Sequence, residues 1–522
     1  MARALLDHFA NGVNPEPVGN RHPFAAWAPH GIYRCAGDDR WVAIAVRGDG
    51  EWHHVTKAST SRRRHVRCGN HGSWATRRAV RQVGCPWRVY VAAPDPTPSF
   101  SATHPLCYAN PQPSTEQPVA PRLYSSLGQA QREFKSIVPG TVRMYVCGVT
   151  PYDVTHLGHA FSYVQFDALR RYLTSLGNDV HYVQNITDID DDMIMVSKRQ
   201  GGRPIAEISD ENDAILRNDL DRLNVLRPWA YPHATDYIPQ IIETTAKIIE
   251  NGCGYVVDGD VFFEAEKFQC YGSLNGASIE DLAKRENPES KREHKKRGVL
   301  DFLLWQQVDP GDPNWDSPWG PGRPGWSIEC TAMSRTILGD QIDIHGGGRD
   351  LLYPHHENEI AQAECASGAS PFCGWWMHNG MLKLDGVKMS KSLGNLVLAR
   401  NLMAEFESDH LRLYLLSNHY RFDADYHDGD MPATKDRYER LKAAAVAETP
   451  AGSGAALTHV VAERLADDFD TPGALDAIDE SARRILSGFG EVGEQEALRS
   501  ALGVLGLAFA GARGPANGDL TP

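Results

Sequence analysis

The sequence lacks long apolar runs and is poor in cysteine. No apolar stretch reaches the roughly 18 residues that a membrane-spanning helix needs, which excludes an integral membrane protein of the helical type. The first residues, Met1–His8, lack the apolar centre of a secretory signal, so we expect none. Ten cysteines in 522 residues are too few for a disulfide-held scaffold. We therefore expect reduced thiols and a cytoplasmic protein that does not contact membranes.

Acidic residues are absent from one segment of the chain. Residues 58–93 contain eight arginines and no Asp or Glu, which is a local charge of +8. Because the net charge of the chain is −14, the remainder carries −22, and this acidic balance argues against a general coat for nucleic acid. Residues 94–121 contain eight prolines, too many for a helix or a central strand. We predict that 58–121 is an Arg- then Pro-rich linker, poorly ordered, with a nucleic-acid-binding arm as the alternative.

Residues 1–57 differ in sequence pattern from the Arg- and Pro-rich segment that follows them. The runs Gly19–Pro23, Ala28–Tyr33 and Arg40–Val46 look like a fragment of the family III CoA-transferases, and the last run predicts a strand. A piece of roughly fifty residues is too short to form its own core. No carboxylate in it matches a catalytic one of that family. We therefore expect this fragment to be non-catalytic.

From residue 122 onward, strand and helix patterns alternate. Residues 142–148 predict a buried strand, 158–176 a helix, and 180–186 a second strand. A strand, a helix and a strand at this spacing form a parallel, right-handed unit. The sequence thus predicts an α/β fold with a doubly wound parallel sheet over 122–432, interrupted by an insertion at about 255–325. Residues 433–522 are rich in Ala, Leu, Glu and Arg and predict a helical bundle.

Two short motifs suggest nucleotide chemistry. His156-Leu157-Gly158-His159 follows the first strand, at the start of a helix, where backbone N–H groups and the helix dipole favour phosphate. Gly158 leaves room for a nucleoside to approach the backbone. Lys388 and Lys391 lie in a loop of small residues and are suited to hold phosphates. Taken singly, each motif also fits an ordinary surface turn.

Both motifs, in this order around an α/β pattern, resemble the HIGH and KMSKS motifs of the class I aminoacyl-tRNA synthetases. Four further residues narrow the family. They are a pair of cysteines, a histidine and a glutamate, which together make a sensible Zn²⁺ ligand set, with ordinary packed cysteines as the alternative: Cys147, Cys330, His355 and Glu359.

The context of these residues is similar to that of the cysteinyl-tRNA synthetase family. The resemblance runs from about Leu123 to Leu505. It rests on the runs Leu123–Leu127, Asn185–Asp191, Gly346–Leu351 and Trp376–Met381.

This resemblance implies a mechanism. One Zn²⁺ would be held by the four residues above and would select the thiol of L-cysteine. Thr187, Trp326 and Asp350 would line the amino-acid pocket, with Asp350 pairing with the ammonium group. ATP would enter with Mg²⁺, and its adenylation would be stabilised by His156 and His159. The lysines would hold the departing pyrophosphate. The residues expected at ATP are His156, Gly158, His159, Gly347, Asp350 and Lys391.

The sequence has features of two families that differ in the acceptor of the activated cysteine. Residues 151–159 and 465–472 resemble a sister group in mycothiol biosynthesis, which joins cysteine to glucosaminyl-inositol, and 433–522 leave no room for a complete anticodon-binding domain. Residues 284–288, however, lack that group's Glu-Arg-Gly-Gly-Asp-Pro motif, and 355–359 and 391–395 are of the tRNA-enzyme type. We therefore predict transfer to tRNA(Cys), with glucosaminyl-inositol as the alternative acceptor. A non-catalytic, nucleotide-binding paralogue is the third hypothesis.

Other cysteines show no spacing that links them. We expect Cys253, Cys270, Cys365 and Cys373 to be packed or surface thiols.

Overall fold

The computed structural model describes residues 31–34, 41–44, 90–92, 120–152, 156–285, 292–389, 393–450, 452 and 454–509. The chain divides into two compact units, Met1–Pro113 and Ser114–Pro522, and each is described by itself. Within the described residues, no helix combines the length and the apolar character that crossing a membrane requires.

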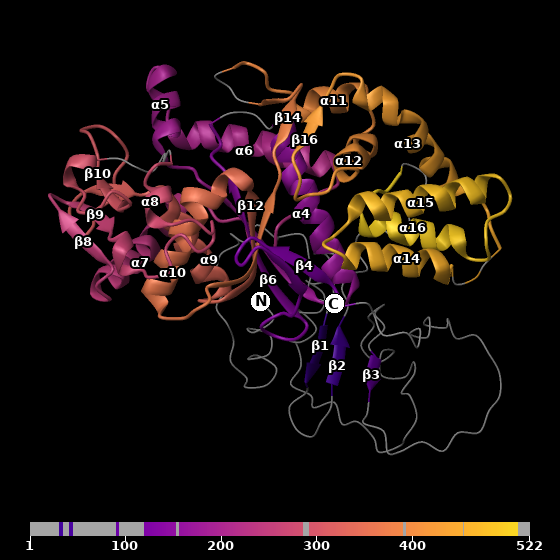
Figure 1. Ribbon diagram of the computed structural model, residues 1–522, viewed down its shortest axis with the longest axis horizontal. Helices are drawn as coiled ribbons and strands as arrows, with labels where there is room; N and C mark the ends of the chain where they lie inside the picture. Colours follow the sequence, from indigo (N-terminus) through magenta and orange to yellow (C-terminus); the bar gives the residue numbers. More distant parts are fainter. Residues whose placement is uncertain are drawn as a thin grey trace, which may run out of the picture. The chain divides into compact units, whose positions relative to one another are not determined.

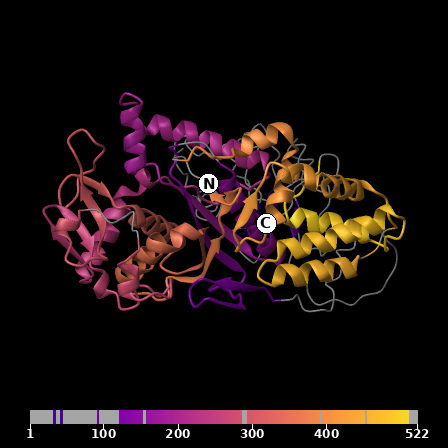
Figure 2. The same ribbon diagram turned by 45° about the horizontal axis from the view of Figure 1, so that its top comes forward.

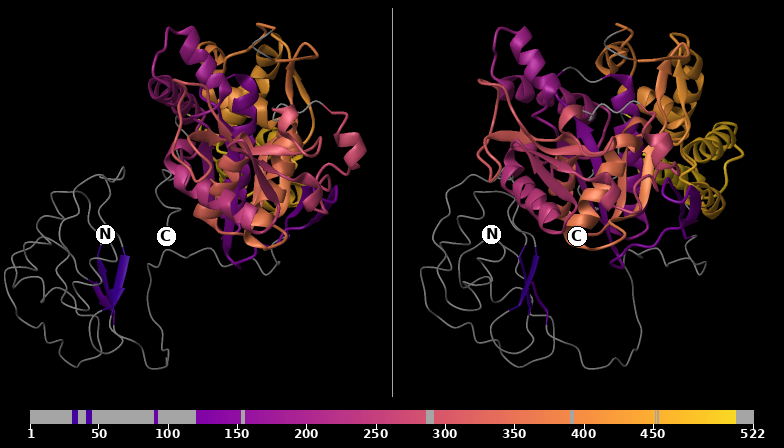
Figure 3. Two further views of the ribbon diagram at one scale, coloured as in Figure 1. Left: turned by 90° about the vertical axis from the view of Figure 1, so that its left-hand side faces the viewer. Right: turned by 60° about the vertical axis from the view of Figure 1, so that its left-hand side comes forward.

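In the first unit, three short strands form an antiparallel sheet in the order β1-β2-β3 (Figure 3). The strands are β1 Gly31–Arg34, β2 Trp41–Ile44 and β3 Tyr90–Ala92. The strand predicted within 40–46 is confirmed by β2. β3 pairs with β2, so this sheet includes one stretch of the segment that the sequence predicts as a linker.

The second unit contains a four-stranded parallel sheet in the order β13-β12-β6-β7. Its two central strands, β6 and β12, are labelled in Figure 1. Helix α4 connects β6 to β7, which pair from Thr141 and Asp179 onward. The predicted strand–helix–strand unit and the α/β class are thereby confirmed. The bounds of these elements are β6 Thr141–Val149, α4 Leu157–Ser175, β7 Asp179–Ile186, β12 Ile342–Gly348 and β13 Cys373–Asn379.

Strand β6 supplies side chains to two different cores. Val142, Met144 and Val146 belong to the core that includes α4. Tyr145 and Cys147 belong to the core formed with two later helices, α9 Trp326–Leu338 and α10 Glu357–Ser367. Because side chains alternate across a strand, this register directs the Cys147 thiol toward α9 and α10.

A separate antiparallel sheet, in the order β11-β10-β9-β8, lies between β7 and β12 in the sequence. Ile241 and Ile248 of helix α7 pack in one core with Val261 and Phe263 of this sheet. The elements of this segment are α7 Ile238–Glu250, β8 Gly254–Val257, β9 Asp260–Phe263, α8 Ile279–Leu282, β10 Phe302–Gln307 and β11 Gly322–Pro324.

The remaining elements before the C-terminal helices are a hairpin, a second small sheet and several helices. A hairpin joins β4 Arg122–Ser125 to β5 Ala130–Glu133, and a second small sheet contains β14 Leu382–Leu384, β15 Val387–Lys388 and β16 Ala424–Tyr426. The other helices here are α5 Asp191–Arg199, α6 Ile205–Arg222, α11 Ala399–Glu405 and α12 Ser408–Leu416. Short turns of helix are η1 Ala234–Tyr237, η2 Ala265–Lys267, η3 Glu293–Lys295, η4 Arg349–Leu351 and η5 Leu352–His356.

Four helices pack against one another at the C-terminal end of the described chain (Figure 2). They are α13 Asp430–Val446, α14 Ala455–Ala466, α15 Thr471–Leu486 and α16 Glu494–Val504. Their buried faces carry mainly Leu, Ile and Ala. The helical bundle predicted for this part of the fold is present.

One expectation about the cysteines is wrong. Cys253 and Cys365 form a disulfide with a Cα–Cα distance of 6.5 Å, although 112 residues separate them in the sequence. The bond ties the segment after α7 to α10. Such a pairing leaves no local sequence signal, since it depends on two helices that pack side by side only in the fold. Cys270 and Cys373 are free, as expected, whereas Cys68, Cys85 and Cys107 lie outside the described residues.

Candidate functional site

A cavity of about 790 Å³ lies where the parallel strands end, and it brings most of the predicted residues together. In doubly wound sheets ligands bind at the carboxyl ends of the strands. Glu359 is fully buried and does not line this cavity, and Lys391 lies outside the described residues. The predicted residues that do line it are Cys147, His156, Gly158, His159, Thr187, Trp326, Cys330, Gly347, Asp350, His355 and Lys388.

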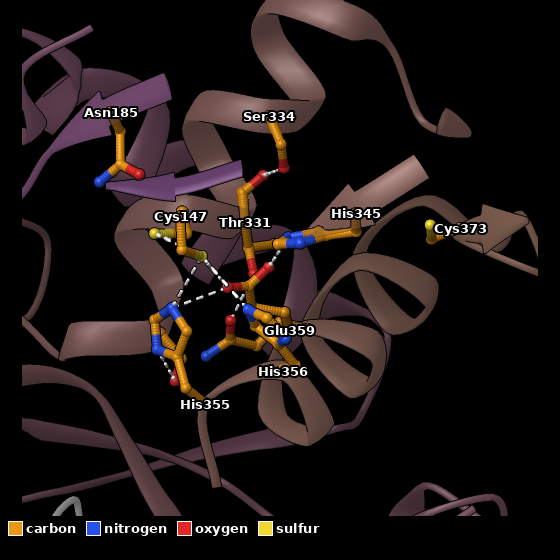
Figure 4. A network of polar contacts seen from close by, with 12 residues as sticks. Cys147, Asn185, Thr331, Ser334, His345, His355, His356, Glu359 and Cys373 are labelled. Atoms are coloured by element: carbon orange, nitrogen blue, oxygen red, sulfur yellow. Dashed lines mark hydrogen bonds and ion pairs between the residues drawn. The ribbon is translucent and has the colours of Figure 1, made fainter. Parts of the chain in front are cut away.

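The four predicted metal ligands converge from four elements, β6, α9, η5 and α10. Figure 4 shows three of them, Cys147, His355 and Glu359. The Cys147 Sγ lies 3.9 Å from the Cys330 Sγ, 3.5 Å from the His355 Nε2 and 3.6 Å from the Glu359 Oε1. The His355 Nε2 is 2.8 Å from the same glutamate oxygen. All four side chains are buried, so the structure assembles a compact set of two sulfurs, one imidazole nitrogen and one carboxylate oxygen.

Mutual contacts shift the ionisation of this cluster. A hydrogen bond from Cys147 lowers the pKa of the Cys330 thiol to about 6, with help from His355, whereas burial raises the pKa of Cys147. Burial alone would raise the pKa of Glu359, but His345 and His355 outweigh it and lower that pKa to about 2. These contacts favour the ionised forms of the Cys330 thiol and the Glu359 carboxyl, which are the protonation states that a divalent metal requires.

A layer of histidines supports the cluster, and the sequence did not reveal it. His345 Nε2 lies 2.5 Å from Glu359 Oε2, and His356 Nε2 lies 3.3 Å from Cys147 Sγ. His356 in turn contacts His378 (Nδ1 to Nε2, 2.7 Å), whose other nitrogen meets the Ser126 hydroxyl at 2.7 Å. The only local signal was the His355–His356 doublet, because the other members come from distant strands.

A second grouping of donors is also possible within this layer. Cys147, His345, His356 and Glu359 lie as close together as the predicted set does. The predicted set contains two sulfurs, and the His355 Nδ1 is fixed by the Ser327 hydroxyl at 3.0 Å, which leaves Nε2 facing the cluster. This is the arrangement typical of a zinc-ligating histidine. The donor types, their burial and this orientation fit a zinc ion at the predicted set.

Replacing His345 by phenylalanine is expected to lower zinc affinity by about 10- to 100-fold, as the loss of a group that orients a ligand does. The ring volume stays in the core, but Glu359 loses its contact with Nε2. The measurement is zinc transfer to a competing chelator. The matched control is H345Q, whose amide reaches the position of Nε2; equal affinities for both variants would contradict the role of this contact.

Two histidines that also line the cavity mark the start of α4. His156 is the N-cap of the helix, and its Nδ1 accepts a hydrogen bond from the Gly158 N–H at 3.1 Å. The His156 and His159 rings stack with their centroids 3.8 Å apart. A side chain at residue 158 would place its Cβ 2.9 Å from the His156 ring, so only glycine preserves this cap. The geometry presents two imidazoles at a helix N-terminus, where anions bind.

Lys388 approaches the same cavity from the β14–β15 hairpin. Its Nζ lies 3.3 Å from Asp350 Oδ2, and both side chains are more than half exposed. Asp350 is thus engaged by a lysine at the mouth of the cavity. An exposed pair of this kind is weak, so both groups are available to a ligand at small cost.

The residues predicted for the amino-acid pocket also line the cavity. The Trp326 ring packs on His355 with centroids 4.3 Å apart, and Thr187 is buried, with its hydroxyl accepting from the Asn185 amide at 3.2 Å. Glu329, which the sequence analysis did not single out, also lines the cavity. Burial raises the pKa of this carboxyl, and Cys330 and Asp190 add to the effect.

Known proteins share this architecture and sequence. The family model described as tRNA synthetases class I (C) catalytic domain matches residues 133–436, and that of CoA-transferase family III matches residues 1–82. The cysteine–tRNA ligase of Aliivibrio fischeri is 43% identical over 369 residues, covering 70% of this chain and 79% of the relative. That of a Dehalococcoides mccartyi strain is 41% identical over 411 residues, covering 77% and 89%.

A solved structure shares the fold at low identity. It is the methionyl-tRNA synthetase of Mycobacterium tuberculosis in complex with methionyl-adenylate, with a TM-score of 0.55, 17% identity, and coverage of 70% of this chain and 90% of that one. At the N-terminus, the CoA-transferase match extends past residue 57, which the sequence analysis took as the end of that fragment. From residue 133 onward, the sequence matches establish that this chain belongs to the cysteine–tRNA ligase family of class I tRNA synthetases.

Proposed function

We propose that this protein is an AMP-forming ligase that activates L-cysteine with ATP and transfers the cysteinyl group to tRNA(Cys). One observation carries the proposal: a single cavity is lined both by members of the buried thiol–imidazole–carboxylate cluster and by two histidines on a helix N-terminus. The cluster suits a thiol, and the histidines suit a phosphate. The enzyme would bind cysteine and ATP together in this cavity and join them.

Cys147, Cys330, His355 and Glu359 would hold a zinc ion. When bound, zinc supplies a soft Lewis acid that binds a thiolate far better than the hydroxyl of serine. A strong directional contact of this kind makes a separate editing step unnecessary. Trp326 would shape the pocket beside it.

At the start of α4, His156 and His159 would stabilise the charge that develops on the α-phosphate during adenylation. Gly158 and Gly347 would let the nucleotide approach the backbone, and Mg²⁺ would accompany ATP. Lys388 would hold the departing pyrophosphate, together with Lys391.

Replacing His159 by alanine is expected to lower the rate of ATP–pyrophosphate exchange by about 100-fold, since it removes one group that stabilises the transition state. The KM for cysteine should stay close to the wild-type value, because the thiol binds at the metal-ligand cluster and not at His159. Steady-state exchange kinetics provide the measurement. As a control, His181→Ala changes an imidazole that stacks on Trp229 outside the cavity and should leave the rate unchanged. A parallel rise in KM would contradict the proposed division of the site.

The activity itself is tested by cysteine-dependent exchange of labelled pyrophosphate into ATP, with serine as the negative control. No exchange by folded, zinc-loaded protein would support the non-catalytic alternative instead. The acceptor is tested by adding tRNA(Cys) and glucosaminyl-inositol in separate reactions. Acylation of the sugar alone would favour the mycothiol-type ligase.

For the rest of the chain, we propose that 122–432 forms the catalytic domain, 433–522 the helical bundle, and 1–57 a non-catalytic CoA-transferase-like fragment followed by the linker. We also propose that the enzyme acts in the cytoplasm, where its tRNA substrate is found.

A further inference from the structure

The carboxylates around the cavity differ in what they contact. Asp191 pairs with Arg323, and Asp350 pairs with Lys388 at 3.3 Å. Asp190 caps helix α5 through the N–H groups of residues 192 and 193. Each of these three carboxylates therefore already has a donor.

Glu329 is different. Only 1% of this residue is exposed, it lines the cavity, and its Oε2 has no hydrogen-bond partner among the described residues. Burying a carboxylate without a donor is costly. An unpartnered carboxylate oxygen at the wall of a cavity is a site for a cationic donor.

The position of Glu329 defines which cation would reach it. It precedes Cys330 on α9 and so lies beside the thiol–imidazole–carboxylate cluster. The groups whose charges act on Glu329 are Cys330, Asp190 and Asp188, which are acidic, and Arg323, which partly offsets them. A small ligand whose sulfur is held at the cluster, and which carries an ammonium group a short distance away, would meet this carboxylate.

We propose that Glu329 binds the α-ammonium group of the substrate amino acid and makes the site selective for amino thiols over other thiols. This inference rests on the proposed function. It assigns the ammonium contact to a buried carboxylate instead of Asp350, the residue that the sequence resemblance suggested. Asp350 lies at the mouth of the cavity, more than half exposed, and is engaged by Lys388. A charge contact is much stronger in the buried position than in the exposed one.

The test uses equilibrium binding to the full-length, zinc-loaded chain by titration calorimetry. The probes are cysteine, cysteamine, which keeps the ammonium group but lacks the carboxylate, and 3-mercaptopropionate, which lacks the ammonium group. Glu329→Gln keeps the shape of the side chain and removes its charge. It is expected to weaken cysteine and cysteamine by at least about 30-fold, the loss typical when one partner of a buried charge pair is removed.

Binding of 3-mercaptopropionate should change little in E329Q, and this result also shows that the variant is folded. Glu329→Asp should recover part of the preference for amino thiols, because it restores the charge. Asp192→Asn is the matched control: it removes a carboxylate from the same cavity wall and should leave the ratio between the probes unchanged.

Equal weakening of all three thiols in E329Q would overturn the inference, because it would indicate a structural role. Selective loss of amino thiols in Asp350→Asn but not in E329Q would overturn it as well. Failure of the proposed function has a separate signature, namely wild-type protein that shows no cysteine-dependent pyrophosphate exchange.

Discussion

Replacing Cys330 by serine is expected to abolish zinc binding and to lower kcat/KM for cysteine by more than about 100-fold, the upper end of what loss of a supporting residue costs a metal site. The thiol of Cys330 is the most acidic cysteine of the cluster, with a pKa lowered to about 6 by the hydrogen bond from Cys147. A serine hydroxyl stays protonated and is a harder ligand, so it does not replace the thiolate. Zinc content per chain and exchange kinetics provide the measurements.

Cys373→Ser is the matched control for this substitution. Cys373 is as buried as Cys330, but its Sγ lies 3.2 Å from the Trp375 carbonyl and outside the donor set. The control variant should keep its zinc. Retention of zinc by C330S would instead assign the metal to the second grouping, Cys147 with His345, His356 and Glu359.

Replacing Arg412 by methionine is expected to lower the free energy of unfolding by about 3 to 5 kcal/mol, because it leaves a buried charge without its partner. Arg412 is fully buried on α12 and pairs with Asp167 of α4. Its guanidinium also donates to the carbonyls of Leu505 and Leu223, both at 2.8 Å. The side chain thus joins α4 to the ends of α6 and α16.

The carboxyl of Asp167 depends on this contact. Burial raises its pKa, but Arg412 and Arg171 outweigh burial and hold the pKa below its usual value. Without Arg412, the carboxylate keeps the pair with Arg171 and the hydrogen bond from the Leu226 N–H. Chemical denaturation followed by circular dichroism measures the change.

The control for this prediction is Arg437→Met. Arg437 pairs with Asp476, a largely exposed residue, at 2.9 Å, and loss of such a pair costs at most about 1 kcal/mol. Similar costs for both variants would show that the Arg412 network contributes no more than a surface pair.

Local sequence patterns were sufficient to predict the central strand–helix–strand unit of the fold. The strand at 142–148 alternates side chains between two cores, and the helix from Gly158 repeats its apolar residues at helical spacing, so both could be predicted without tertiary information. Local sequence was likewise sufficient to predict which kinds of side chain form the metal-ligand cluster. Two cysteines, a histidine and a glutamate suggested a metal by their identity and by resemblance, and the fold brings their donor atoms together.

Other features depended on contacts between distant segments. The Cys253–Cys365 disulfide joins the segment after α7 to α10, and nothing in either local sequence indicates the partner. The supporting histidines His345, His356 and His378 come from two strands and one turn, and each looks like an ordinary buried residue when taken alone.

The sequence by itself determined the fold class, the family and the kinds of side chain that line the cavity. These depend on local periodicity and on motifs that stay contiguous. Only the tertiary structure decided which carboxylate is left without a partner. Asp350 and Glu329 are equally acidic in the sequence, but one is exposed beside a lysine and the other is buried beside the cluster. Burial and pairing are properties of packed neighbours, so they exist only once the chain has folded.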